Sequence, residues 1–222
     1  MLSDYLKISF LMMRARPVRA ALSLLGIFIG VLALVIILSI REGIRRQLDD
    51  LYRTEGKAEL IGGRIVHLMA TGCRPNQVAG RIYRSLAEYA DANGGQAFTD
   101  NMGFVVPELA SGRESFSPDT SFYDRALPKN RMRFIEGPPT LAVEVRSEGD
   151  YIPSAEVEIA AKRADYFAAG TRVVWDVDPV AETVTCYRAS APAAPVVFRR
   201  GQTAEAEPAV PGWRVAVDWI FR

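Results

Sequence analysis

The sequence is poor in the side chains that build zinc sites and disulfide scaffolds, with one histidine and two cysteines in 222 residues. Cys73 and Cys186 lack the CxxC or Cys/His spacing of zinc ligands, and two cysteines are too few for a disulfide scaffold. We expect free thiols, although a single bridge stays open. His67 has no partner at ligand spacing, so it is expected to be a packed strand residue rather than a metal ligand.

The sequence also lacks an excess of charge of one sign. Its 27 Lys and Arg residues balance 26 Asp and Glu residues, for a formal net charge of +1. Net charge therefore gives no nucleic-acid signature, and any contact with DNA must come from a local patch. The candidate patch is a predicted loop over residues 124–136, which carries Arg125, Lys129, Arg131 and Arg133. A phosphate contact and a solvated connection are both open for this loop.

Only one long apolar run is present. Residues 20–40 carry no charge. A run of this length is about what a helix needs to cross a ~30 Å hydrocarbon core. A signal peptide is disfavoured, because the run exceeds the usual apolar core and Ser39-Ile40-Arg41 offers no small-x-small cleavage site. We expect an N-terminal flank (1–19), a transmembrane helix (20–40), a helical stalk (41–54) and a soluble domain (55–222).

The orientation of this single-pass membrane protein is undecided. Four basic residues lie on each side of the span: Lys7, Arg14, Arg16 and Arg19 before it, and Arg41, Arg45, Arg46 and Arg53 after it. The positive-inside count therefore ties. We expect the soluble domain on the cytoplasmic side, and a homodimer stays open.

The soluble domain alternates strand and helix signals. Predicted elements are a hairpin over 58–69 with Gly62-Gly63 as its turn, a helix over 76–92 capped by Asn76, paired strands over 103–107 and 115–123, a strand around 141–145, a helix over 154–169 capped by Ser154, a strand hairpin over 171–177 and 183–188, a loop over 190–208 around a short strand at 196–198, and a final strand over 211–221.

One predicted strand carries a carboxylate in its middle. Leu141, Val143 and Val145 alternate with Ala142, Glu144 and Arg146, so Glu144 shares a face with Arg146. A buried ionised glutamate is costly unless it is paired or holds a metal. Glu144 is therefore expected either to pair with Arg146 or to help hold a cation, and a solvated salt bridge on an edge strand is the alternative.

Two further elements carry candidate site residues. Asp119 follows a proline that can stand only at the start or edge of a strand, so it is expected where the chain enters the sheet. Glu158, Lys162 and Tyr166 recur at helical spacing and share one face of the predicted helix. Lys162 is expected either to pair with Glu158 or to point back toward Glu144.

The order of these motifs resembles the Uma-two family of restriction-endonuclease-like proteins, in the PD-(D/E)xK nuclease superfamily. The matching motifs, spread over residues 55–221, are Glu59-Leu-Ile-Gly-Gly-Arg64, Pro118-Asp119, Glu144-Val145-Arg146-Ser147, Lys162-x3-Tyr166-x3-Gly170, Val174 to Pro179 and Pro211-Gly-Trp213. The resemblance implies an α/β (α+β) fold with a mixed sheet flanked by helices, and a metal-dependent endonuclease that hydrolyses DNA.

The resemblance also assigns roles to residues. Asp119 and Glu144 would be the ligands of Mg²⁺ or Mn²⁺, Lys162 the catalytic lysine carried on the helix, and Glu59, Arg146 and Tyr166 supporting residues. Arg146 stands where the superfamily usually has a lysine, and an arginine supports charge but does not act as a base.

Two more positions depart from the family pattern. Gly62 replaces an aspartate in the opening hairpin, and Asn76 replaces a histidine before the following helix. A nuclease-fold protein that binds a partner without cleaving therefore stays open as an alternative function.

The apolar segment has a resemblance of its own. The sequence Arg19-Ala-Ala-Leu-Ser-Leu-Leu-Gly-Ile-Phe-Ile-Gly-Val31 is similar to the first membrane helix of MacB/FtsX-type ABC transporter permeases. This similarity covers about the first 50 residues, and the sequence has no second apolar run. A transporter is not expected, whereas a fusion that carries a permease fragment stays open.

Overall fold

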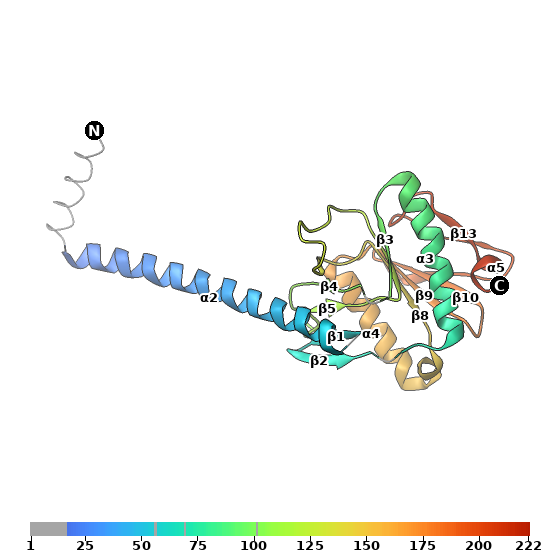
Figure 1. The fold of residues 1–222 in the computed structure, drawn as a ribbon, viewed down its shortest axis with the longest axis horizontal. Helices are drawn as coiled ribbons and strands as arrows, with labels where there is room; N and C mark the ends of the chain where they lie inside the picture. Colours follow the sequence, from blue (N-terminus) through green and yellow to red (C-terminus); the bar gives the residue numbers. More distant parts are fainter. Residues whose placement is uncertain (1–16, 56, 69, 101) are drawn as a thin grey trace. The chain divides into compact units, whose positions relative to one another are not determined.

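The structure is a computed structural model that describes residues 17–55, 57–68, 70–100 and 102–222. The chain divides into two compact units, residues 1–50 and 51–222. Helix α2 (Pro17–Glu55) begins in the first unit and is continuous over 39 residues (Figure 1). Its segment Ala21–Ser39 has a mean hydropathy of 3.0 and no buried residues. The basic residues predicted to flank the span at positions 7, 14 and 16 lie outside the described residues.

Residues 51–222, the soluble unit, are built on a six-stranded sheet, and the mixed sheet that the family resemblance implies is confirmed. Its strands lie in the order β11-β10-β9-β8-β6-β3. All neighbouring strands are antiparallel except β8 and β9, which are parallel and are connected through helix α4 (Pro153–Ala169). The bounds are β3 (Gln96–Thr99), β6 (Thr120–Tyr123), β8 (Leu141–Val145), β9 (Val173–Asp178), β10 (Thr183–Arg188) and β11 (Ala191–Phe198).

Strand β8 lies in the middle of this sheet, so the edge-strand interpretation of its carboxylate is wrong. Leu141 and Val143 are fully buried in a core that includes apolar residues of helix α3 (Cys73–Asn93). Ala142 points to a second core, which Tyr166 of α4 shares. The two helices therefore cover opposite faces of the sheet, and the period of two predicted from the sequence is confirmed.

Three small sheets surround the main one. Strands β1 (Ala58–Ile61) and β2 (Arg64–His67) form a hairpin whose two turn glycines both have positive φ, which suits the twist of a two-residue turn. The second sheet contains β4 (Phe104–Val105), β5 (Ser115–Phe116) and β7 (Ile135–Glu136). The third contains β12 (Thr203–Glu205) and β13 (Arg214–Ala216), and the short helix α5 (Val217–Ile220) follows it.

Both predicted N-caps are wrong, whereas Gly94 and Gly170 are the C-caps of the two helices. Helix α3 begins at Cys73 with Gly72 as its N-cap, so Asn76 lies inside the first turn. Helix α4 begins at Pro153 after Ile152, because proline is already preorganised for the first helical position. A 3₁₀ helix, η1 (Glu148–Tyr151), precedes it.

Several predicted strands also differ in the structure. Residues 115–123 split into β5 and β6 of different sheets, and the break falls at Pro118, which cannot donate a ladder hydrogen bond. The segment expected as a loop around 196–198 forms the eight-residue β11, whose prolines are tolerated on an edge strand. The final segment is a short strand followed by α5 rather than one strand. His67 lies on the exposed β2, so its expected packing is wrong.

Candidate active site

Two carboxylates meet where β6 and β8 lie side by side. Thr120 of β6 pairs with Val143 of β8 in an antiparallel register, which places the preceding Asp119 opposite Glu144. Asp119 is fixed there because its Oδ2 accepts a hydrogen bond of 2.8 Å from the backbone N–H of Val145. Asp119 thus lies where the chain enters the sheet, as predicted.

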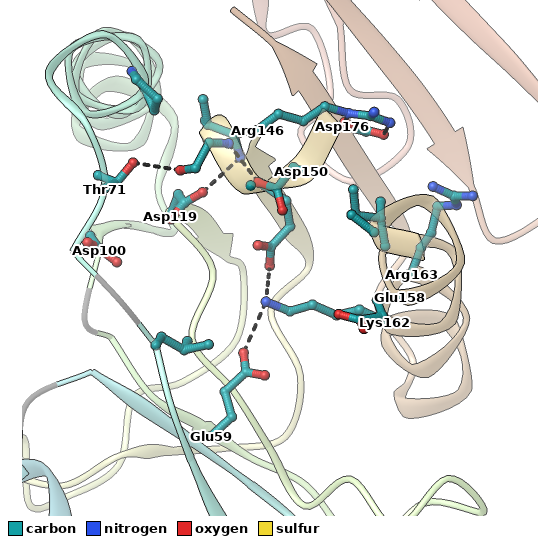
Figure 2. A pocket seen from close by; sticks show the side chains of 18 of the residues that line it. Glu59, Thr71, Asp100, Asp119, Arg146, Asp150, Glu158, Lys162, Arg163 and Asp176 are labelled. Carbon is teal, nitrogen blue, oxygen red and sulfur yellow. Dashed lines mark hydrogen bonds and ion pairs between the residues drawn. The ribbon is translucent and has the colours of Figure 1, made fainter. Parts of the chain in front are cut away.

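Lys162 reaches these carboxylates from helix α4. Its Nζ lies 3.0 Å from Oε1 of Glu144 and 3.1 Å from Oε1 of Glu59. Figure 2 shows Lys162 extended between its helix and the carboxylates, with a dashed line to Glu59. The choice left open by the sequence is resolved in favour of Glu144 rather than Glu158.

Glu59 is the most enclosed acid of the site, with a side chain only 3% exposed. It accepts hydrogen bonds from the Arg113 guanidinium and from the backbone N–H of Ser117. Burial alone would raise the pKa of Glu59, but Lys162, Arg113 and the Ser117 N–H outweigh it, so the pKa is lowered. These contacts favour the ionised form of Glu59, which anchors Lys162.

Glu144 has the opposite electrostatic setting. Burial raises the pKa of Glu144, and the nearby Asp119 and Glu59 raise it further, although Lys162 and the Tyr166 hydroxyl oppose them. The Tyr166 hydroxyl donates to Oε1 of Glu144 at 2.6 Å, while its ring stacks on Phe116. The net result is a carboxyl group with a raised pKa, held in place by a tyrosine and a lysine.

Lys162 itself stays protonated. Burial lowers its pKa, but Glu144, Glu59 and Asp119 more than offset this effect, and the pKa is raised. A lysine in this state donates hydrogen bonds and stabilises negative charge, and it does not take up a proton.

A second lysine belongs to the site, and it is absent from the sequence prediction. Lys57 lies 3.0 Å from Oδ1 of Asp119 and 2.5 Å from Asp100, and its side chain is only 15% exposed. Burial lowers the pKa of Lys57, but Asp119 and Asp100 outweigh it, so the pKa is raised. Lys57 could have been found from its position two residues before Glu59, because side chains at this spacing lie on one side of an extended chain.

Arg146 does not pair with Glu144, so that interpretation of the central strand is wrong. Its guanidinium makes two hydrogen bonds to Asp176, of 2.7 and 2.6 Å, and an ion pair of 3.0 Å with Glu156. Asp176 stands beside Glu144 in the register of β8 and β9. Arg146 is therefore bound to strand β9 through a bidentate ion pair with Asp176.

These side chains line a cavity of about 1010 Å³, and more acidic than basic residues line it. The basic loop lies elsewhere. Strand β6 separates Asp119 from Asp124, and Arg125, Lys129 and Arg131 line a different, smaller pocket together with Asp124. A basic loop beside the carboxylates, which a phosphate contact there would need, is therefore not found.

The candidate ligands of a divalent cation are Asp119 and Glu144. Asp119 and Glu144 offer hard oxygen ligands, which suit Mg²⁺ or Mn²⁺. Burial and, to a smaller extent, the nearby Asp119 raise the pKa of Glu144, and a cation would relieve the repulsion between the two carboxylates. Among the described residues no cluster of three or more His, Cys, Asp or Glu side chains has metal-ligand geometry. Two carboxylates suffice for Mg²⁺ only where water or a substrate phosphate supplies the remaining ligands.

Comparison with solved structures places the fold among nuclease-like α+β proteins. A crystal structure from Anabaena variabilis ATCC 29413, described as "a putative nuclease belonging to DUF820", matches with a TM-score of 0.60 and 18% sequence identity. The match covers 76% of this chain and 91% of that one. At this identity the similarity concerns the fold alone.

The family is shown by the sequence. Residues 45–218 match the profile of the Uma2 family, described as "Putative restriction endonuclease", and the chain belongs to that family. No curated protein matches the chain. The comparisons give no support to the resemblance between the first 50 residues and ABC transporter permeases.

Proposed function

We propose that the soluble unit is a metal-dependent endonuclease that hydrolyses phosphodiester bonds of DNA. The observation that carries the proposal is the convergence of Asp119, Glu144 and Lys162 in one cavity, with Lys162 3.0 Å from Glu144. Membership of the Uma2 family supports the same activity. Paired carboxylates and a lysine are what phosphoryl chemistry with Mg²⁺ requires.

Each residue has a defined task in this proposal. Asp119 and Glu144 would hold Mg²⁺ or Mn²⁺, and a bound ion acidifies water and neutralises charge on the phosphate. Lys162 is held protonated by Glu144 and Glu59, so it stabilises negative charge on the phosphoryl oxygens and does not act as the base. Glu59 and Arg113 keep Lys162 in position.

The test is Mn²⁺ titration combined with cleavage of plasmid DNA. Asp119→Ala and Glu144→Ala should each abolish measurable Mn²⁺ binding and lower cleavage by at least about a hundredfold. Glu158→Ala is the matched control, because Glu158 lines the same cavity but is not the partner of Lys162. Cleavage that survives both substitutions would refute the site.

A nuclease-fold binding protein without cleavage is the second candidate. It is favoured by one observation: lysines already neutralise both carboxylates, Lys57 at Asp119 and Lys162 at Glu144. Such a protein would show no Mn²⁺ binding that depends on Asp119 and Glu144. The same titration therefore separates the two functions.

We further propose that helix α2 tethers the protein to a membrane, with the soluble unit on the cytoplasmic side. The support is the apolar segment Ala21–Ser39, whose side chains are exposed in the structure. The protein should sediment with membranes and be released by detergent but not by alkaline carbonate. Protease added to intact cells should leave the soluble unit uncut, and digestion would place it outside.

A further inference from the structure

The two carboxylates of the site are neutralised in different ways. Both oxygens of Asp119 are engaged, because Oδ2 accepts from the Val145 N–H and Oδ1 contacts Lys57. At Glu144, by contrast, the Tyr166 hydroxyl and Lys162 both contact the same oxygen, Oε1. A cation can thus approach Glu144 through its other oxygen, but it meets Lys57 at Asp119.

Lys57 also has a second carboxylate within reach. Its ammonium lies between Asp119 at 3.0 Å and Asp100 at 2.5 Å, so it bridges two acids. Loss of the Asp119 contact would still leave Lys57 paired with Asp100. The cost of displacing the ammonium from Asp119 is therefore much lower than that of leaving a largely buried charge without a partner.

We propose that Lys57 is a positioning residue that competes with the divalent cation for Asp119, an inference that rests on the proposed metal site. In the metal-free protein Lys57 is the counter-ion of Asp119 and prevents its repulsion with Glu144. With a metal ion bound, Asp100 would retain the ammonium and Asp119 would be free to help hold the ion. Lys57 and Asp100 together thus set the metal affinity of the site, and Lys162 keeps its place on Glu144 and Glu59.

The proposal predicts two substitutions with effects of opposite sign. Lys57→Met removes the competing cation, so the Kd for Mn²⁺ should fall by about tenfold, which is about 1.4 kcal/mol. Asp100→Asn removes the carboxylate that receives the ammonium, so the Kd should rise. The affinities are measured by isothermal titration calorimetry on the full chain in detergent, with folding checked by circular dichroism.

A matched control separates direct competition from a general change of charge. Arg163 lines the same cavity and stacks on Tyr187, so Arg163→Met removes one positive charge while Lys57 and Asp119 stay unchanged. Its Kd for Mn²⁺ should change by less than about twofold. An equal gain in affinity for Arg163→Met and Lys57→Met would overturn the proposal, because it would reflect net charge alone.

The remaining outcomes are also decisive. Weaker Mn²⁺ binding in Lys57→Met would mean that Lys57 only orients Asp119, and it would overturn the proposal. Unchanged or tighter binding in Asp100→Asn would do the same, even if the lysine variant did not fold. Absence of DNA cleavage would contradict the proposed nuclease and leave this inference intact, because its readout is metal affinity. Absence of Mn²⁺ binding in every variant would refute both.

Discussion

At the scale of single residues, the site depends on how neighbouring charges change one another. Glu59 and Glu144 are both glutamates bound to Lys162, yet the pKa of Glu59 is lowered and that of Glu144 is raised. The difference arises because Glu59 has Arg113 as an additional cation, whereas Glu144 faces the carboxylates of Asp119 and Glu59. The surroundings of Glu59 thus favour its ionised form, which anchors Lys162. The ionised form of Glu144 is disfavoured, and a bound metal ion would stabilise it.

The first prediction concerns the role of Lys162. Because its pKa is raised, we expect Lys162 to supply a positive charge rather than to act as a base. Lys162→Met should lower the rate of DNA cleavage by about 10² to 10³, and Lys162→Arg should retain a substantial part of it, since both residues are cations. Cleavage kinetics on supercoiled plasmid provide the measurement. Equal inactivity of the two variants would show that Lys162 must lose a proton.

The second prediction concerns pH. The Tyr166 hydroxyl stabilises the ionised form of Glu144, so its removal raises the pKa of Glu144 still further. Because a metal ion competes with a proton for the carboxylate, Mn²⁺ affinity falls as the pH drops through that pKa. In Tyr166→Phe this loss should occur at higher pH than in the wild type.

The control for this pH shift is Tyr89→Phe, which removes a hydroxyl that donates to the carbonyl of Pro211, outside the cavity. Its curve of Mn²⁺ affinity against pH should coincide with that of the wild type. A Tyr166→Phe curve that moves to lower pH would contradict the assigned role of the hydroxyl.

At the scale of elements, one arginine joins the β1 hairpin to helix α4. Arg113 donates to Glu59 of β1 and, at 2.9 Å, to Asp165, which lies three residues after Lys162. It thereby fixes both the anion that anchors Lys162 and the helix that carries it. Its side chain is only 10% exposed, so these charges are screened little by water.

The third prediction follows from this connection. Arg113→Met leaves Glu59 buried without one of its two cations, and the free energy of unfolding should fall by about 3 kcal/mol. Urea denaturation of the full chain in detergent measures the loss. Arg74→Met is the control, because its ion pair with Glu182 is exposed to solvent and should contribute far less to stability. A loss of similar size in both variants would contradict the connecting role of Arg113.

At the scale of the whole molecule, we expect the acidic side chains around the cavity to repel a DNA backbone. Acidic residues outnumber basic ones around the cavity, and Lys57, Arg113, Arg146 and Lys162 are all paired with carboxylates. The basic loop stands at the other end of β6. A phosphate backbone is therefore expected to approach the carboxylates only together with divalent cations.

The fourth prediction tests this arrangement. Binding of a fluorescent DNA duplex, followed by anisotropy at constant ionic strength, should be at least about tenfold tighter with Ca²⁺ than with EDTA. Replacement of Lys129 and Arg131 by alanine should leave this difference unchanged. Tight binding in EDTA that the loop variant abolishes would place DNA on the loop and away from the cavity.

The sequence by itself determined the local order of this protein. Alternation of apolar residues identified β8 and its two faces, and spacing of four placed Lys162 and Tyr166 on one side of a helix. These features depend on neighbours in the chain, so the residue pattern suffices. The sequence pattern missed the N-caps, the strand ends and the length of β11. These depend on where prolines stand and which strand lies at the sheet edge, and both can override the secondary-structure preference of single residues.

Only the tertiary structure decided which charges meet. Arg146, two residues from Glu144, bonds instead to Asp176, and Lys57 bonds to Asp119, 62 residues away. These partners are set by strand order and by the register of β6, β8 and β9, which bring distant segments side by side. The physical reason is that an ion pair depends on distance in space, and the packing of the sheet against its helices fixes that distance.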